Sequence, residues 1–273
     1  MSSAVPVAAT VLEIGLILGG LAVLWRFALS PAARARPAVV LLSKWEIAPL
    51  NFLFFVWGIY AGGFLIQFLS FQLLQSVAGL STEMKLVLAS AGNDAGMIVA
   101  WLLAKPRLDP RPADSPPAVH GKMPWAAGVL TFLAAWPVVL LVMLIWQNGL
   151  EALGAPLEKQ DSVDLFANAE GPLWVGFLLV FAVVLAPVTE ELVYRGAIFR
   201  FVRGRLPRWL ALVGPAALFA ALHLNLASFA PLLTLALIFS LVYERTGDIR
   251  VTMIAHGLFN LNTALLIFAG IGM

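Results

Sequence analysis

Long runs of apolar residues, separated by short polar connections, recur along all 273 residues of the chain. A helix needs about 20 mainly apolar residues to cross the hydrocarbon core of a bilayer, and most of these runs approach or exceed that length. We expect spanning helices at Val7–Leu29, Leu50–Leu74, Ala91–Ala104, Trp125–Trp146, Pro172–Tyr194, Trp209–Leu224, Phe229–Tyr243 and Val251–Phe268. The pattern predicts an all-α polytopic membrane helix bundle of about eight transmembrane helices.

We expect one transmembrane domain over residues 1–273, with N-terminal spans within 1–150 and a set of core spans within 172–268. The first apolar run lacks a basic segment before it and contains Glu13, which predicts a retained span and not a cleaved signal peptide. The Pro-rich segment Lys105–Pro117 is typical of an exposed loop.

Composition supports a membrane protein. The chain is 61% hydrophobic and 12% charged, whereas soluble domains carry about 25% charged residues. A net charge of +2 gives no reason to expect a nucleic-acid partner. The sequence has no cysteine, which excludes disulfides, a thiol nucleophile and cysteine-ligated metal.

Basic residues occupy alternate connections between the predicted spans. They lie within Arg34–Lys44, Lys105–Lys122, Arg200–Arg208 and Arg245–Arg250, and the other connections contain few. The positive-inside rule therefore predicts an integral membrane protein with both termini outside and these connections in the cytoplasm.

The segment APVTEELVYRG places two carboxylates at the end of an apolar run. Glu191 and Arg195 are four residues apart, the favoured order for an ion pair within a helix. Glu190 points about 100° away from Glu191 and must meet another helix or water. Pro187 should bend the helix. If the span ended at Thr189, the glutamates would lie at the interface, but the helix dipole disfavours carboxylates at a helix C-terminus.

Later spans carry the other polar groups in apolar surroundings. His223 lies on the sixth predicted span, and Thr252, His256 and Asn260 form a polar stripe on the eighth. Either histidine alone would indicate an interhelical hydrogen bond. Together with Glu190 they indicate a shared polar site. His223 is ~22 Å along its helix from the preceding arginine, but His256 is only ~9 Å along its own. The groups can therefore meet only if the helices tilt, or if Arg250 lies below the membrane surface or snorkels.

Three motifs carry a family resemblance. They are EELVYR (Glu190, Glu191, Arg195), FAALH (Phe219, His223) and HGLFN (His256, Asn260). In this order they resemble the CPBP family of intramembrane proteases, which includes type II CAAX prenyl endopeptidases and bacterial bacteriocin-processing or immunity proteins. The resemblance covers about Pro172 to Phe268, and the first four spans match by topology alone.

The resemblance implies an endopeptidase that hydrolyses a peptide bond of a membrane-associated, CAAX-like or lipidated protein or peptide with a glutamate-activated water. Glu190 would be the general base and His223 would bind the water. His256 and Asn260 would donate hydrogen bonds to the oxyanion. Glu191 and Arg195 would form a structural pair, with Phe219 in support. We expect a polar cavity that opens toward the cytoplasm beside Arg200–Arg208.

The family is traditionally classed with metalloproteases, and Glu190, His223 and His256 would form a standard zinc set. No HExxH spacing is present. A carboxamide is a poor zinc ligand and a good oxyanion donor, so Asn260 favours a mechanism that requires no cofactor. Zinc remains the alternative.

Two other classes of function stay open. Intramembrane Glu, His and Arg also occur in transporters, but the chain shows no repeat halves. A non-catalytic immunity or scaffold protein of the same fold is the other reading. Size and the lack of organelle targeting predict a prokaryotic inner (plasma) membrane protein whose partners are its substrate and the lipid bilayer; the sequence gives no oligomeric state.

Overall fold

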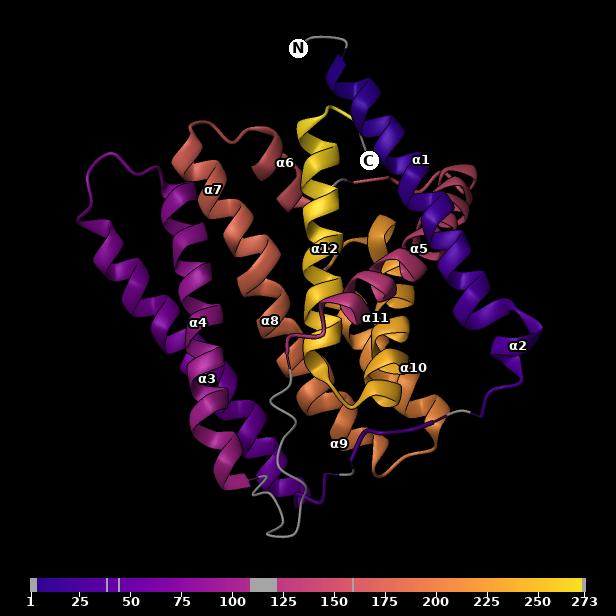
Figure 1. Ribbon diagram of the computed structural model, residues 1–273. Helices are drawn as coiled ribbons and strands as arrows, with labels where there is room; N and C mark the ends of the chain where they lie inside the picture. The colour runs from indigo at the N-terminus through magenta and orange to yellow at the C-terminus, as the bar shows by residue number, and fades with distance from the viewer. Residues whose placement is uncertain (1–3, 38, 44, 109–121, 159, 272–273) are drawn as a thin grey trace.

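The structure, a computed structural model, describes residues 4–37, 39–43, 45–108, 122–158 and 160–271. These residues form helices and contain no strand (Figure 1), so the predicted all-α membrane bundle is confirmed. The long helices are α1 (Ala4–Leu24), α3 (Pro49–Gln75), α4 (Thr82–Leu108), α5 (Trp125–Ala152), α11 (Leu226–Thr246) and α12 (Ile249–Phe268). The short ones are α2 (Pro31–Arg34), α6 (Asp161–Ala167) and α10 (Arg208–Ala221).

One further helix runs without a break from Pro172 to Arg203, nine residues beyond the end predicted from the apolar run. It consists of α7 (Pro172–Val180), the π-helical segment η2 (Phe181–Leu185), α8 (Ala186–Glu191), the π-helical segment η3 (Leu192–Phe199) and α9 (Arg200–Arg203). We call it the glutamate helix. Glu190 therefore lies 13 residues, or about 20 Å, from the end of this helix.

Seven helices in the described part of the chain are long and apolar enough to cross a membrane. The helix at the sixth predicted position, α10, has only 14 residues and a length of about 21 Å, against a hydrocarbon core of about 30 Å. It stops because the chain turns before α11, with Leu224 in the left-handed region at φ 51°. His223 consequently lies in a turn and not within a helix.

Helix α4 is longer at both ends than its apolar run, which suggested Ala91–Ala104. Its first turn is polar, and residues 105–108, expected in the Pro-rich loop, are still helical. The rest of the expected loop lies outside the described residues.

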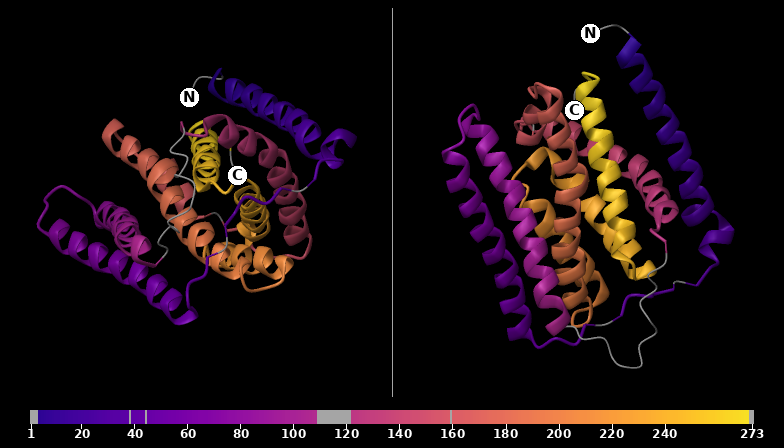
Figure 2. Two further views of the ribbon diagram at one scale, coloured as in Figure 1. Left: turned by 60° about the horizontal axis from the view of Figure 1, so that its bottom comes forward. Right: turned by 60° about the vertical axis from the view of Figure 1, so that its left-hand side comes forward.

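The helices form a central group with a helix pair at one side and α1 at the other (Figures 1 and 2). The described parts of the basic connections lie at one end of the bundle, opposite the start of α1 and the end of α12. Contacts hold this end together: Arg200 donates to the Ser43 carbonyl, and Arg203 and Arg208 pair with the buried Glu244.

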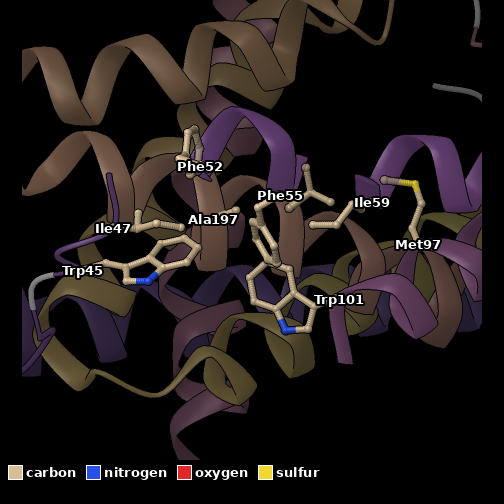
Figure 3. Close-up of a cluster of buried hydrophobic side chains, with 9 residues drawn as sticks. Trp45, Ile47, Phe52, Phe55, Ile59, Met97, Trp101 and Ala197 are labelled. Carbon is tan, nitrogen blue, oxygen red and sulfur yellow. The ribbon is translucent and has the colours of Figure 1, made fainter. Parts of the chain in front are cut away.

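Helices α3 and α4 pack closely because small residues face each other. A Cβ on Gly62 would lie 2.9 Å from the Ala100 Cβ, and a Cβ on Gly96 would lie 2.7 Å from the Gly62 carbonyl oxygen. Small residues that let helix backbones approach are the usual basis of association in membranes. The pair joins the glutamate helix through a cluster that includes Phe55, Trp101 and Ala197 (Figure 3).

Helix α1 has few buried residues and is held by a polar contact. The Glu13 carboxylate accepts hydrogen bonds from Trp136 Nε1 of α5 at 3.0 Å and from Asn262 Nδ2 of α12 at 2.8 Å. A membrane-embedded carboxylate needs such donors. Glu13 therefore fixes α1 against the central helices.

Replacing Gly62 by leucine should destabilise the protein, because the larger side chain separates α3 from α4. We expect a loss of about 1–3 kcal/mol, the usual range for overpacking. The Gly58→Leu substitution, one turn earlier where nothing lies within 4 Å, is the matched control. Thermal unfolding in detergent compares the two variants, and equal midpoints would contradict the packing argument.

Candidate functional site

The glutamate helix departs from α-helical geometry just before the two glutamates. In η2 the Ala186 N–H donates to the Phe181 carbonyl, five residues back, so the Ala182 carbonyl loses its usual donor. The next residue, Pro187, has no N–H to replace it. Asn260 Nδ2 of α12 donates to this carbonyl at 2.8 Å. The proline and the π-helical segment thus create the acceptor that Asn260 satisfies.

Close contact between the two helices depends on Gly257 of α12. A Cβ at this position would lie 2.4 Å from the Val183 carbonyl oxygen. The glycine therefore allows α12 to approach the backbone of η2 and places Asn260 against Ala182. One N–H of the Asn260 carboxamide is committed to the fold, and a carboxamide has a second.

Glu191 lies at the centre of a buried charge cluster. Its side chain has no solvent exposure, its Oε1 lies 2.9 Å from Arg195 Nη1, and the same oxygen lies 3.0 Å from His256 Nδ1. The contact with Arg195 is the one expected from the spacing. The contact with His256 was not expected, because no pattern in either segment pairs the two residues across helices.

Arg195 is enclosed by aromatic rings. Its guanidinium carbon lies 4.7 Å from the ring centroid of Phe219 on α10 and 5.5 Å from that of Phe239 on α11. Arginine over an aromatic face is stabilised by the ring quadrupole, more strongly when water is excluded. Phe219 therefore supports the ion pair directly.

His256 lies between the two glutamates. Its Nδ1 must carry a proton, since Glu191 already accepts from Arg195 and a carboxylate only accepts. Its Nε2 lies 3.6 Å from Oε2 of Glu190. Glu190 is 30% exposed, but its buried Oε2 has no hydrogen-bond partner among the described residues, and the same holds for Oε2 of Glu191. Since Arg195 and His256 already engage Glu191 through Oε1, Glu190 is the carboxylate left available for chemistry.

His223 presents a free ring nitrogen. Its Nδ1 lies 2.8 Å from the Phe219 carbonyl, and because a carbonyl oxygen only accepts, Nδ1 carries a proton. In the neutral imidazole, Nε2 then has the lone pair. The Phe219 ring contacts both histidines, with centroids 4.7 Å from His223 and 6.2 Å from His256. His223 and His256 therefore share a contact, the Phe219 ring, and so lie close to each other.

The sequence suggested that His256 lies much nearer to the basic end of the bundle than Glu190 and His223. The positions at which the helices begin and end remove this difference. Helix α12 starts opposite Phe199, with Ile249 in the same cluster, whereas the glutamate helix continues to Arg203. Asp248 caps α12, and the hydrogen bonds from Arg250 lower the pKa of its carboxyl. His256 therefore lies deeper than its distance from Arg250 suggested.

Three residues near Glu190 were not predicted as site residues. Asp94 of α4, Tyr60 of α3 and Tyr194 of the glutamate helix all interact electrostatically with Glu190. Asp94 had a sequence signal, because it is a carboxylate within an apolar span. Tyr194 also had one, because it lies four residues after Glu190 in the same helix. Tyr60 had none, since phenols are common at the ends of membrane helices.

The residues described do not form a zinc site as arranged. No group of three His, Cys, Asp or Glu side chains within the described ranges could hold a metal ion. The set of Glu190, His223 and His256 is therefore not assembled for zinc, and we derive no step through a metal. The expectation that no cofactor is required stays a prediction.

A surface hollow does lie beside the basic cluster, where a cavity was expected. It is lined by Trp45, Glu46, Ile47, Ala48, Pro49, Gly204 and Arg205. This lining includes neither Glu190 nor the two histidines. A hydrated passage from this end to Glu190 remains a prediction.

Replacing Arg195 by alanine should be strongly destabilising, because it leaves Glu191 buried without its counter-charge. Breaking a buried ion pair typically costs 3–5 kcal/mol. Arg250→Ala removes an arginine from a partly exposed pair with Asp248 and should have a much smaller effect. Unfolding midpoints of the two variants in detergent test this, and a similar loss in both would contradict the central role of Arg195.

Comparisons with known proteins agree with the motifs. Residues 172–262 match a family model described as type II CAAX prenyl endopeptidase Rce1-like. The chain is 31% identical over 104 residues to the UPF0177 protein YbdI of Lactococcus lactis subsp. lactis (strain IL1403). That alignment covers 38% of this chain and 55% of the relative, so the chain spans about half the length of the curated relative it matches. No solved structure matches the chain. The resemblance is confirmed: residues 172–262, which contain all three motifs, match the model of the Rce1-like type II CAAX prenyl endopeptidase family.

Proposed function

We propose that the protein is an intramembrane endopeptidase in which Glu190 activates the water that attacks the scissile peptide bond. One observation carries the proposal: in the described part of the chain, the buried Oε2 of Glu190 lies beside His256 without a hydrogen-bond partner, whereas Glu191 is held by Arg195 and His256. A membrane protein keeps such a group only for a purpose. The family whose model this segment matches suggests the reaction class.

In the first step a water molecule gives a proton to Glu190 while its oxygen attacks the carbonyl carbon of the substrate. The electron pair of the carbonyl bond moves to oxygen and forms the oxyanion. The carbon–nitrogen bond then breaks, and Glu190 returns the proton to the leaving nitrogen. Glu190 thus acts as general base and then as general acid.

The two histidines assist in different ways. The lone pair on His223 Nε2 accepts a hydrogen bond from the water and orients it toward the carbonyl carbon. Glu191 holds the Nδ1–H of His256 at 3.0 Å and so fixes its ring. When His256 also carries a proton on Nε2, that N–H donates to the oxyanion. The second N–H of Asn260 is the other donor that the family resemblance implies.

The substrate is a membrane-associated protein or peptide, of the CAAX-like or lipidated kind. The site lies about 20 Å from the basic end of the bundle, measured along the glutamate helix. With that end in the cytoplasm, as the positive-inside rule predicts, both termini are outside and substrate enters from the cytoplasmic side. We place the protein in a prokaryotic inner membrane.

One observation favours a non-catalytic role in the same fold. Asn260 and His256 both bind other helices, as interhelical ties would, through Ala182 and Glu191. A scaffold or immunity protein would need those ties. It would not need the unpartnered Glu190, and this residue therefore separates the two functions.

Glu190→Gln should abolish cleavage while the protein still folds, because glutamine cannot accept the proton. General base catalysis contributes about 10²–10⁴-fold. Quantitative proteomics of new protein termini would compare membranes from cells with the wild type and with the variant. Glu83→Gln, at an exposed carboxylate in the first turn of α4, is the control. Identical sets of termini in all three would refute a protease and favour the scaffold.

His223→Ala tests both the water-binding role and the zinc alternative. Without zinc, the variant should lose activity because the water is no longer oriented, and a chelator should leave the wild type unaffected. Elemental analysis of purified wild type provides the second measurement. Stoichiometric zinc, absent from His223→Ala, together with inactivation by the chelator, would establish the metal-dependent mechanism.

A further inference from the structure

Helix α12 and its histidine lie on one side of Glu190, and helices α3 and α4 cover the other side. Thr189, its neighbour in the chain, donates from Oγ1 to the Asp94 carbonyl of α4 at 3.4 Å. Ile59 and Met97 line a small apolar gap together with Thr189 and Val193. The helix pair therefore packs directly on the turn of the glutamate helix that carries Glu190.

Depth along the helices agrees with these contacts. Tyr60 is 11 residues, or about 17 Å, from the start of α3 at the basic end. Asp94 is 14 residues, or about 21 Å, from the end of α4 at the same end. Glu190 is about 20 Å from the end of its helix. The three side chains come from one level of the bundle.

An arc of aromatic rings runs from this side to the histidines. Tyr60 and Tyr194 pack against the same buried cluster, where their hydroxyl groups interact with each other and with the charge of Glu190. The Tyr194 ring stands edge-on to Phe219 with centroids 5.0 Å apart. Phe219 in turn contacts His223 and His256. Tyr60, Tyr194 and Phe219 thus form a continuous row of rings beside Glu190, with Tyr60 at the end farthest from the histidines.

Several hydrogen-bond donors near Glu190 are already engaged within the fold. Asn260 gives one N–H to Ala182, and His256 gives its Nδ1–H to Glu191. His223 gives its Nδ1–H to Phe219. Two phenols that interact with each other can share one hydrogen bond, which leaves one O–H free. That donor lies on the side of Glu190 opposite α12.

We propose that Tyr60, supported by Tyr194, donates its O–H to the carbonyl oxygen of the scissile bond as the oxyanion forms. The α3–α4 pair would then complete an active site whose other residues all lie within 172–262. The tyrosine forms no covalent bond and keeps its proton; it stabilises charge that exists only after the water has attacked. This inference rests on the proposed function.

The test uses the three tyrosines of the chain, two beside Glu190 and Tyr243 in a separate cluster with Phe199. The probe is a farnesylated CAAX-type peptide with a fluorophore and a quencher, cleaved by the full-length protein in liposomes. Tyr60→Phe should lower kcat by about 10²–10³-fold with little change in KM, as expected for an oxyanion donor. Tyr194→Phe should lower kcat less, and Tyr243→Phe should match the wild type.

Each outcome separates this inference from the proposed function. If the wild type cleaves the probe, Glu190→Gln does not, and Tyr60→Phe retains the wild-type kcat, Tyr60 is not the donor and the protease stands. If Tyr60→Phe raises KM or lowers the unfolding midpoint with a matching loss of kcat, Tyr60 is structural and the inference fails. If the wild type leaves the probe intact, the proposed CAAX-like substrate is wrong, and the inference falls with it.

Discussion

The structure depends on one buried ion pair and what surrounds it. Glu191 and Arg195 have no contact with solvent, and each reaches beyond its own helix: Glu191 to His256 of α12, Arg195 to the rings of Phe219 and Phe239. Two charges in a membrane must be paired where they lie. Four helices are therefore fixed relative to each other at this point, and so is Glu190, which directly precedes Glu191 in the chain.

Much of this could be predicted from local rules. The spacing of Glu191 and Arg195 predicts their pair, since residues four apart meet on a helix. Apolar length predicts most spans, and alternating basic connections predict which ends of the helices lie together. The missing N–H of Pro187 predicts a disturbed helix. Each of these inferences needs only residues within one helix or the loop beside it.

The rest depends on contacts between distant segments. Asn260 binds Ala182, 78 residues away, and nothing in either segment shows that a carbonyl there lacks a donor. His256 was expected at the oxyanion, and its second role, as partner of Glu191, follows only from where α12 begins. Tyr60 lies 130 residues before Glu190, so its place beside the site arises from the packing of α3 and α4 on the glutamate helix. The hydrophobic pattern of a helix does not show which of its residues lie at the same depth as those of a neighbouring helix.

The short helix α10 has a consequence for the lipids around it. It ends about 9 Å short of a full crossing, and the turn that follows exposes Leu222 and Leu224. Acyl chains in the leaflet away from the basic end must shorten or tilt beside this turn. This local thinning brings headgroup water closer to the carbonyl groups at the end of α10, which have no hydrogen-bond donor within the helix. The protein should therefore be more stable in a thin membrane than in a thick, sterol-rich one.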